Sequence, residues 1–110
     1  MSHLLHSKCQ VLDGGKPMNE DEIHRHLNEV SGWHLNNGAI EKSFNFKDYL
    51  ELMAFTNAMA WICHTEDHHP DVSMGYNRCT VRFNTHSVGG ISVNDFICAA
   101  KVNALVAFGA

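Results

Sequence analysis

The chain has 110 residues, 45% of them hydrophobic, which is enough for one hydrophobic core but too few for two separate domains. Its formal net charge of -4 at pH 7 argues against direct binding to nucleic acid or to an anionic membrane surface. The four cysteines are widely spaced and form no Cys-x-x-Cys pair, so we expect reduced thiols in a cytoplasmic protein.

The first part of the chain lacks a regular pattern. Residues 1–18 include two glycines and a proline and show no sustained hydrophobic period. We therefore predict an irregular N-terminal lead-in over 1–18 and a single domain over 19–110. The N-terminus also lacks the apolar core of a secretory signal, which agrees with the expected cytoplasmic location.

A first helix is predicted to begin after Asn19 and to end before Gly32. Asn19 and Glu22 have the spacing of an N-terminal capping box, in which each side chain accepts a hydrogen bond from the other residue's backbone. The apolar residues that follow recur at helical spacing: Ile23, Leu27 and Val30.

A β-hairpin is predicted over residues 33–46. The Asn-Asn-Gly sequence at 36–38 supplies residues that tolerate positive φ, which favours a turn between two strands. The second strand alternates with a period of two, and one of its faces carries Ile40, Lys42, Phe44 and Phe46.

A long central helix is predicted over residues 47–67, which contain neither glycine nor proline. Pro70 disfavours helical backbone at His69, so the helix should end just before the paired histidines. Its expected core residues are Leu50, Met53, Ala54, Trp61 and Ile62, with Phe55, Ala58 and Met59 widening the apolar face.

Two more strands are predicted at 72–75 and 76–86, the second from alternation of Cys79, Val81 and Phe83 with polar residues. A last helix follows the glycines at 89–90. Its start is indicated by a second capping pattern, formed by Ser92 and Asp95.

This last helix carries two apolar sets, which is more than one small sheet can cover, so we expect a neighbouring subunit to cover the second set. Lys101 and Asn103 interrupt it, and it falls short of the roughly 20 apolar residues that a membrane-spanning helix requires. The first set is Val93, Ile97, Ala100, Ala104 and Phe108, and the second is Phe96, Ala99, Val102 and Val106.

The predicted order of elements is α-β-β-α-β-β-α. Such an order favours an α+β domain in which helices cover one face of an antiparallel sheet. We therefore expect a four-stranded antiparallel sheet with three helices packed on one face.

The residues that could carry chemistry stand at the ends of these elements. His68, His69 and Pro70 follow the central helix, His86 ends a strand, and Asp95 lies in the first turn of the last helix. Imidazoles titrate near neutral pH, and element ends hold side chains on rigid supports. We expect these three element ends to converge on one acid/base pocket.

These residues resemble the signature of the pterin-4a-carbinolamine dehydratase family in type and spacing, and the wider resemblance extends over residues 32–105. The chain departs from that pattern at His64, where many relatives carry an acidic residue, and at Val72, where some carry an aromatic one. The run begins at His64, and the residues in it that carry the resemblance are His68, His69, Pro70, Tyr76, His86 and Asp95.

The resemblance implies an α+β fold that assembles into a homodimer or homotetramer. It also implies a pterin substrate: dehydration of 4a-hydroxytetrahydrobiopterin to quinonoid dihydropterin, without a metal or other cofactor. That reaction would serve tetrahydropterin recycling for an aromatic amino acid hydroxylase.

The reaction must protonate the departing hydroxyl and remove a proton from a ring nitrogen. On this resemblance we expect His68 and His86 to be the catalytic acid/base pair, with His69 beside them in the catalytic set, binding and orienting the pterin. Asp95 is expected to fix an imidazole tautomer. Pro70 and Tyr76 complete the expected substrate-binding residues, and Tyr76 either walls the pocket or supports it.

Structural interpretations stand beside these functional ones. A histidine at a helix end can simply interact with terminal carbonyls, and Asp95 can be no more than a capping carboxylate. Strict alternation places His86 on the face of Asn84, opposite Phe83. Either a twist or bulge re-aims His86, or the pocket is completed on that face.

Two other functions remain hypotheses. The first is a non-catalytic protein-binding role, because animal members of the family also act as dimerisation cofactors of a homeodomain transcription factor. The second is a zinc site, in which His64 and His68 form an i, i+4 pair, His86 adds a third imidazole and Glu66 supplies a base.

Overall fold

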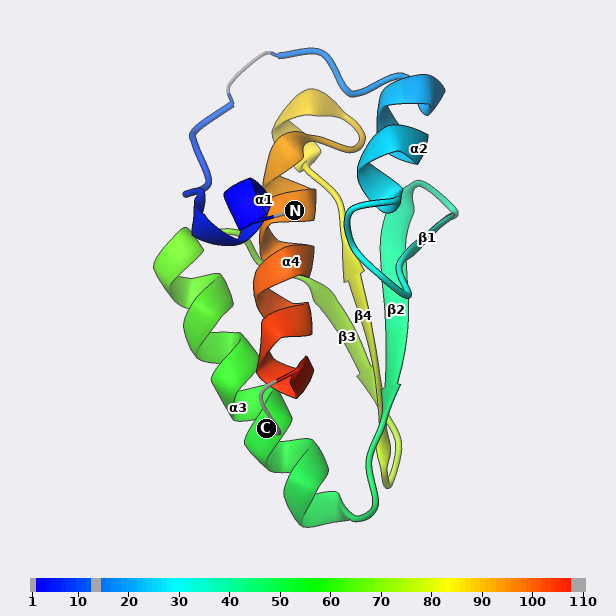
Figure 1. Cartoon of the computed structure of the whole chain (residues 1–110), viewed down its shortest axis with the longest axis vertical. Helices are drawn as coiled ribbons and strands as arrows, with labels where there is room; N and C mark the ends of the chain where they lie inside the picture. The colour runs from blue at the N-terminus through cyan, green and yellow to red at the C-terminus, as the bar shows by residue number, and fades with distance from the viewer. Residues whose placement is uncertain (1, 13–14, 108–110) are drawn as a thin grey trace.

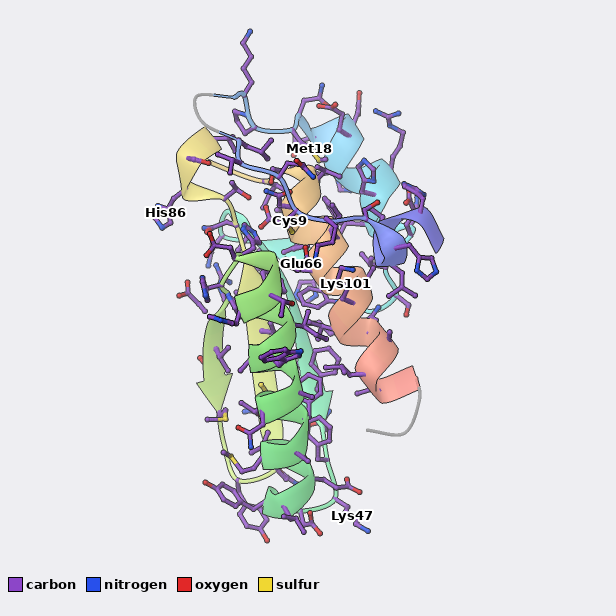
Figure 2. The ribbon with its side chains drawn as sticks, turned by 90° about the vertical axis from the view of Figure 1, so that its left-hand side faces the viewer. Cys9, Met18, Lys47, Glu66, His86 and Lys101 are labelled. Carbon is purple, nitrogen blue, oxygen red and sulfur yellow. The ribbon has the colours of Figure 1, made fainter. Side chains whose placement is uncertain are left out.

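The computed structural model describes residues 2–12 and 15–107, and it confirms the predicted α+β architecture. Figures 1 and 2 show a sheet with helices α2, α3 and α4 on one of its faces. The elements are α1 (Ser2–His6), α2 (Glu20–Leu27), β1 (His34–Asn36), β2 (Ala39–Asn45), α3 (Tyr49–Glu66), β3 (Asp71–Met74), β4 (Arg78–Phe83), the 3-10 turn η1 (His86–Val88) and α4 (Val93–Ala107).

The sheet is antiparallel throughout, with the strand order β1-β2-β4-β3. Its central pair places Ile40 opposite Phe83 and Phe44 opposite Cys79, so their apolar side chains share the face that the helices cover. This register follows from the period-two pattern, because a shift by one residue would turn both apolar rows to solvent.

Lys42 is the polar member of the core-facing row on β2, and its ammonium group has specific partners. Its Nζ donates hydrogen bonds to the Ser31 carbonyl and to Asn103 Oδ1, each at 2.9 Å. Trp33 Nε1 donates to the same Asn103 oxygen at 2.9 Å. Partial burial lowers the pKa of Lys42, and these bonds satisfy a charge that the apolar row would otherwise leave unpaired.

The buried face of α3 differs from the predicted one. Leu50 is 78% exposed and Trp61 68% exposed, so the expected core stack that contained them is wrong. Because α3 carries apolar residues on most of its circumference, periodicity alone did not fix which stripe faces the sheet. The buried stripe is Leu52, Phe55, Met59, Cys63 and Glu66.

The second apolar set of α4 is covered by the chain itself, which corrects the expectation that a neighbouring subunit covers it. Phe96, Ala99 and Val102 are fully buried. Part of the cover comes from α1, whose Leu4 belongs to the same core, so the lead-in predicted to be irregular contains a short helix. Phe108, assigned to the first set, lies outside the described residues.

In the part of the chain that the structure describes, no helix combines the length and the apolar character that crossing a membrane requires.

Replacing Phe55 with Ala should destabilise the fold by about 3–5 kcal/mol, because the ring is fully buried and its loss leaves a cavity. Val11→Ala is the matched control, since this exposed side chain should change stability by no more than about 0.5 kcal/mol. Urea denaturation of both variants measures the difference, and equal losses would contradict the assigned core.

Candidate active site

The C-terminus of α3 presents His68 to the interior. Asp67 adopts a left-handed conformation with φ 52° and ψ 43°, which aspartate tolerates better than most residues. The His68 backbone N–H then donates to the Cys63 carbonyl at 3.1 Å, a bond typical of a Schellman helix end. The helix ends before the paired histidines, as predicted.

His68 and Asp95 are in direct contact. His68 Nε2 lies 2.5 Å from Asp95 Oδ1, and their side chains are 12% and 0% exposed. The His68 ring also stacks on Phe83, with the ring centroids 5.8 Å apart and an interplanar angle of 10°. The carboxylate bond and the aromatic face together fix the plane of the imidazole.

The second oxygen of Asp95 caps the N-terminus of α4. Asp95 Oδ2 accepts hydrogen bonds from the Ser92 backbone N–H and from Thr85 Oγ1, both at 2.9 Å. Because Thr85 donates its proton to the carboxylate, Ser92 Oγ must donate to Thr85 across their 2.7 Å contact. The capping and functional interpretations of Asp95 therefore hold at the same time, one on each oxygen.

This arrangement determines which nitrogen of His68 can exchange protons. A carboxylate only accepts hydrogen bonds, so Nε2 carries the proton that faces Asp95. In the neutral imidazole, Nδ1 is then left as the acceptor. His68 can take up a proton there, and Asp95 stabilises the positive charge that results.

His69 and His86 lie at the same end of the molecule but are exposed to solvent. His69 and the partly buried Pro70 belong to the connection between α3 and β3, and Figure 2 shows His86 projecting from η1 away from the helices. Thr85 points inward to Asp95, and the next residue, His86, points outward. The alternation of side-chain direction therefore continues past the end of β4. The alternative in which a bulge turns His86 toward the core is thus excluded.

Tyr76 lies at the other end of the molecule, so within one chain the structure does not bring it together with His68, as the expected pocket requires. It is exposed in the β3–β4 connection and stacks on Tyr49, the first residue of α3, at a centroid distance of 6.5 Å. Figure 2 shows both ends of the molecule: the labelled Lys47 lies at the end near Tyr49, and the labelled His86 lies at the opposite end. Within one chain, β3 separates Tyr76 from His68.

The geometry does not gather the residues of the zinc-site hypothesis. Within residues 2–12 and 15–107, no three His, Cys, Asp or Glu side chains are arranged as metal ligands. His64 is exposed, whereas Glu66, its proposed base, is turned toward Lys8 and Lys101. The Nε2 atom of His68 is hydrogen-bonded to Asp95.

A cavity of about 250 Å³ opens beside His68, and an N-terminal segment forms one wall of it. This segment, Lys8–Leu12, is called the N-terminal strap below. Gln10 N–H donates to Asn94 Oδ1 at 3.0 Å, and Asn94 Nδ2 donates back to the Gln10 carbonyl at 2.7 Å. The cavity is lined by Cys9, Gln10, Val11, Leu12, Glu66, Asp67, His68, Thr85, Ser87 and Asn94.

Sequence reasoning missed the strap and its anchors. No periodicity marks residues 8–12, and their partners are distant in the chain. The one available signal was Glu66, a carboxylate at a core position of α3, because a buried charge requires a partner.

Glu66 ties the strap to the helices (Figure 2). Its Oε1 accepts the Cys9 backbone N–H at 2.8 Å, and its Oε2 lies 3.1 Å from Lys8 Nζ and 3.7 Å from Lys101 Nζ. Burial alone would raise the pKa of Glu66, but the Cys9 N–H and the two ammonium groups outweigh it and lower the pKa below 4.5.

The lowered pKa predicts how the strap responds to acid. Its stabilising contribution is complete above pH 4.5, the unperturbed value, and is lost as pH falls through the lower folded-state value. Glu66→Gln should therefore cost about 1 kcal/mol at pH 7 and less at pH 3. Urea denaturation at both values measures this, with Glu51→Gln, which breaks an exposed pair with Lys47, as the control. A cost that does not change with pH would contradict the assignment.

Known proteins share both sequence and fold with this chain. A family model described as pterin 4 alpha carbinolamine dehydratase matches residues 16–105. A relative from Stenotrophomonas maltophilia strain K279a is 53% identical over 105 residues, which is 93% of this chain and 90% of that protein. One from Nitrosospira multiformis is 48% identical over 99 residues, 89% of this chain and 88% of the relative. Both carry the provisional name pterin-4-alpha-carbinolamine dehydratase.

A solved structure also matches this chain in fold. A crystal structure from Brucella melitensis, described as a transcriptional coactivator/pterin dehydratase, is 34% identical, with a TM-score of 0.79 over 82% of this chain and 98% of that one. The family match therefore includes His68, Asp95 and the elements that bring them together. The chain belongs to the pterin-4a-carbinolamine dehydratase family.

Proposed function

We propose that this chain dehydrates 4a-hydroxytetrahydrobiopterin to quinonoid dihydropterin by histidine general acid/base catalysis. The observation that carries the proposal is the buried contact between His68 and Asp95. It supplies an imidazole of fixed tautomer beside a cavity, as acid/base catalysis requires. Family membership supplies the substrate class.

The reaction needs two proton transfers. A ring nitrogen of the substrate loses a proton, and the neighbouring carbon loses its hydroxyl, which leaves as water once it has been protonated. We assign these transfers to His68 and His86, one acting as base and the other as acid, and assign pterin orientation to His69. Thr85 supports this grouping, because it precedes His86 and hydrogen-bonds to the carboxylate that holds His68.

Two imidazoles suffice for this elimination, so the proposal includes no metal and no cofactor. It also includes a functional link to an aromatic amino acid hydroxylase, since the hydroxylation reaction generates the carbinolamine substrate. The expected place of action is the cytoplasm.

His68→Ala and His86→Ala should each lower kcat by roughly 10²-fold, if each is the sole group for its proton. His69→Ala should instead raise KM with a smaller effect on kcat, as expected for a group that binds substrate and transition state equally. Stopped-flow measurement of dehydration, with the uncatalysed rate subtracted, tests the three variants against the unmodified chain.

Two results would count against this proposal. Near-native kcat in folded His68→Ala and His86→Ala variants would remove the acid/base assignment. An unmodified chain that does not accelerate dehydration would favour the alternative, a protein-binding role as dimerisation cofactor or coactivator. That alternative draws on the description of the Brucella structure, which pairs coactivator with dehydratase.

We also propose a homodimer or homotetramer that uses the outer face of α3. Leu50 and Trp61 are both largely exposed there. Leu50 and Trp61 are 11 residues apart, which is three helical turns plus about 20°, so their side chains point in nearly the same direction from the helix axis. They form one apolar stripe with the exposed Ala54 between them. Large exposed hydrophobic side chains on one face are typical of an interface.

Replacing Leu50 and Trp61 together with Lys should shift the protein toward a 12.3 kDa monomer, because each charge would be buried without a partner at the interface. Val11→Lys, at an exposed apolar residue on the strap, is the matched control and should not change the assembly. Multi-angle light scattering gives the masses. An unchanged mass for the double variant would place the interface elsewhere.

A further inference from the structure

Two cysteines far apart in the sequence meet beside the cavity. The Cys9 Sγ lies 3.7 Å from the Cys98 Sγ, across 89 positions of sequence. Cys9 is on the N-terminal strap, while Cys98 is on α4, three residues after Asp95. The contact therefore joins the strap to the helix that carries the carboxylate of the candidate site.

The two thiols differ in accessibility. Cys98 is fully buried, whereas Cys9 is only partly buried and lines the cavity. A solvent oxidant would meet Cys9 first. Cys9 also belongs to a segment rather than a helix, so its side chain has more freedom to rotate toward Cys98 than the reverse.

We infer that Cys9 and Cys98 form an oxidation site that closes to an intramolecular disulfide when the protein meets a peroxide. The sulfurs must approach by less than 2 Å from their 3.7 Å separation to reach the roughly 2.05 Å of a disulfide bond. A turn of the Cys9 side chain is a change of that size. This inference does not rest on the proposed dehydratase activity.

The chemistry takes two steps. The Cys9 thiolate attacks one oxygen of hydrogen peroxide, and the O–O bond breaks to give a Cys9 sulfenic acid and, after protonation, water. The Cys98 sulfur then attacks the Cys9 sulfur and displaces the hydroxyl, which leaves as a second water with the Cys98 proton. Two thiols lose two electrons and two hydrogens, and one peroxide is reduced to two waters.

The order of attack follows from the environments of the thiols. The hydrogen bond with Cys9, followed by burial, raises the pKa of Cys98, so Cys98 stays protonated until a partner sulfur is activated. Burial likewise raises the pKa of Cys63, the third thiol of this region, to about 12. Cys9 is thus the attacking sulfur, and Cys98 resolves its sulfenic acid because it is already in contact.

The disulfide would change the attachment of the strap. In the reduced protein, Glu66 and Asn94 hold the strap by hydrogen bonds and ion pairs that can open separately. A covalent link at Cys9 would fix one wall of the cavity to α4. Amide hydrogens of residues 9–12 should then exchange roughly tenfold more slowly or slower still, because opening of the strap is suppressed.

The test is peroxide treatment of the full chain, followed by intact mass, non-reducing peptide mapping and hydrogen exchange. The expected product is lighter by about 2 Da, the mass of two hydrogens, contains a peptide pair joined through Cys9 and Cys98, and reverts with dithiothreitol. Slower exchange of the strap should accompany it.

Matched variants complete the test. Cys63→Ala should still form the cross-link, whereas Cys98→Ala should lose it and accumulate higher oxidation states at Cys9. The inference is overturned if the unmodified chain oxidises at Cys9 without the Cys9–Cys98 peptide pair, or if Cys63 proves to be the partner. Because peptide mapping is done on the unmodified chain, the outcome does not depend on whether either variant folds.

Discussion

The candidate site depends on the hydrogen bonds that the Asp95 carboxylate accepts. This carboxylate is fully buried, so leaving it without donors would cost several kcal/mol. Its Oδ2 accepts hydrogen bonds from the Thr85 hydroxyl and the Ser92 backbone N–H, and its Oδ1 is paired with His68. One side chain thereby joins the start of α4, the end of β4 and the end of α3. Removing it would leave three element ends without the contact that brings them together.

The strap is attached to the immediate neighbours of this pair. Asn94, next to Asp95, pairs with the backbone of Gln10, and Glu66, two residues before His68, accepts the N–H of Cys9. Any displacement of the strap therefore acts on the two backbone segments that position the imidazole and the carboxylate. For this reason the N-terminal segment belongs to the site in physical terms, although it contributes none of the family's signature residues.

Local patterns account for what could be predicted. The end of α3 before Pro70 and the capping carboxylate Asp95 are encoded within a few residues, so their placement was correct. The buried face of α3 was misassigned because Leu50 and Trp61 are as apolar as Phe55, and only the partner surface distinguishes them. The anchors of the strap escaped prediction because residue separations of 57 and 84 leave no periodic trace.

His86 shows how the fold constrains the proposed chemistry. Thr85 turns its hydroxyl inward to Asp95, and Asp95 binds His68, whereas His86 projects outward from η1 (Figure 2). Direct proton relay between His68 and His86 is not supported by this arrangement. An elimination does not need it, because one proton leaves a ring nitrogen and another is delivered to a hydroxyl. Two separated imidazoles, each handling its own proton, match a substrate that presents both groups at once.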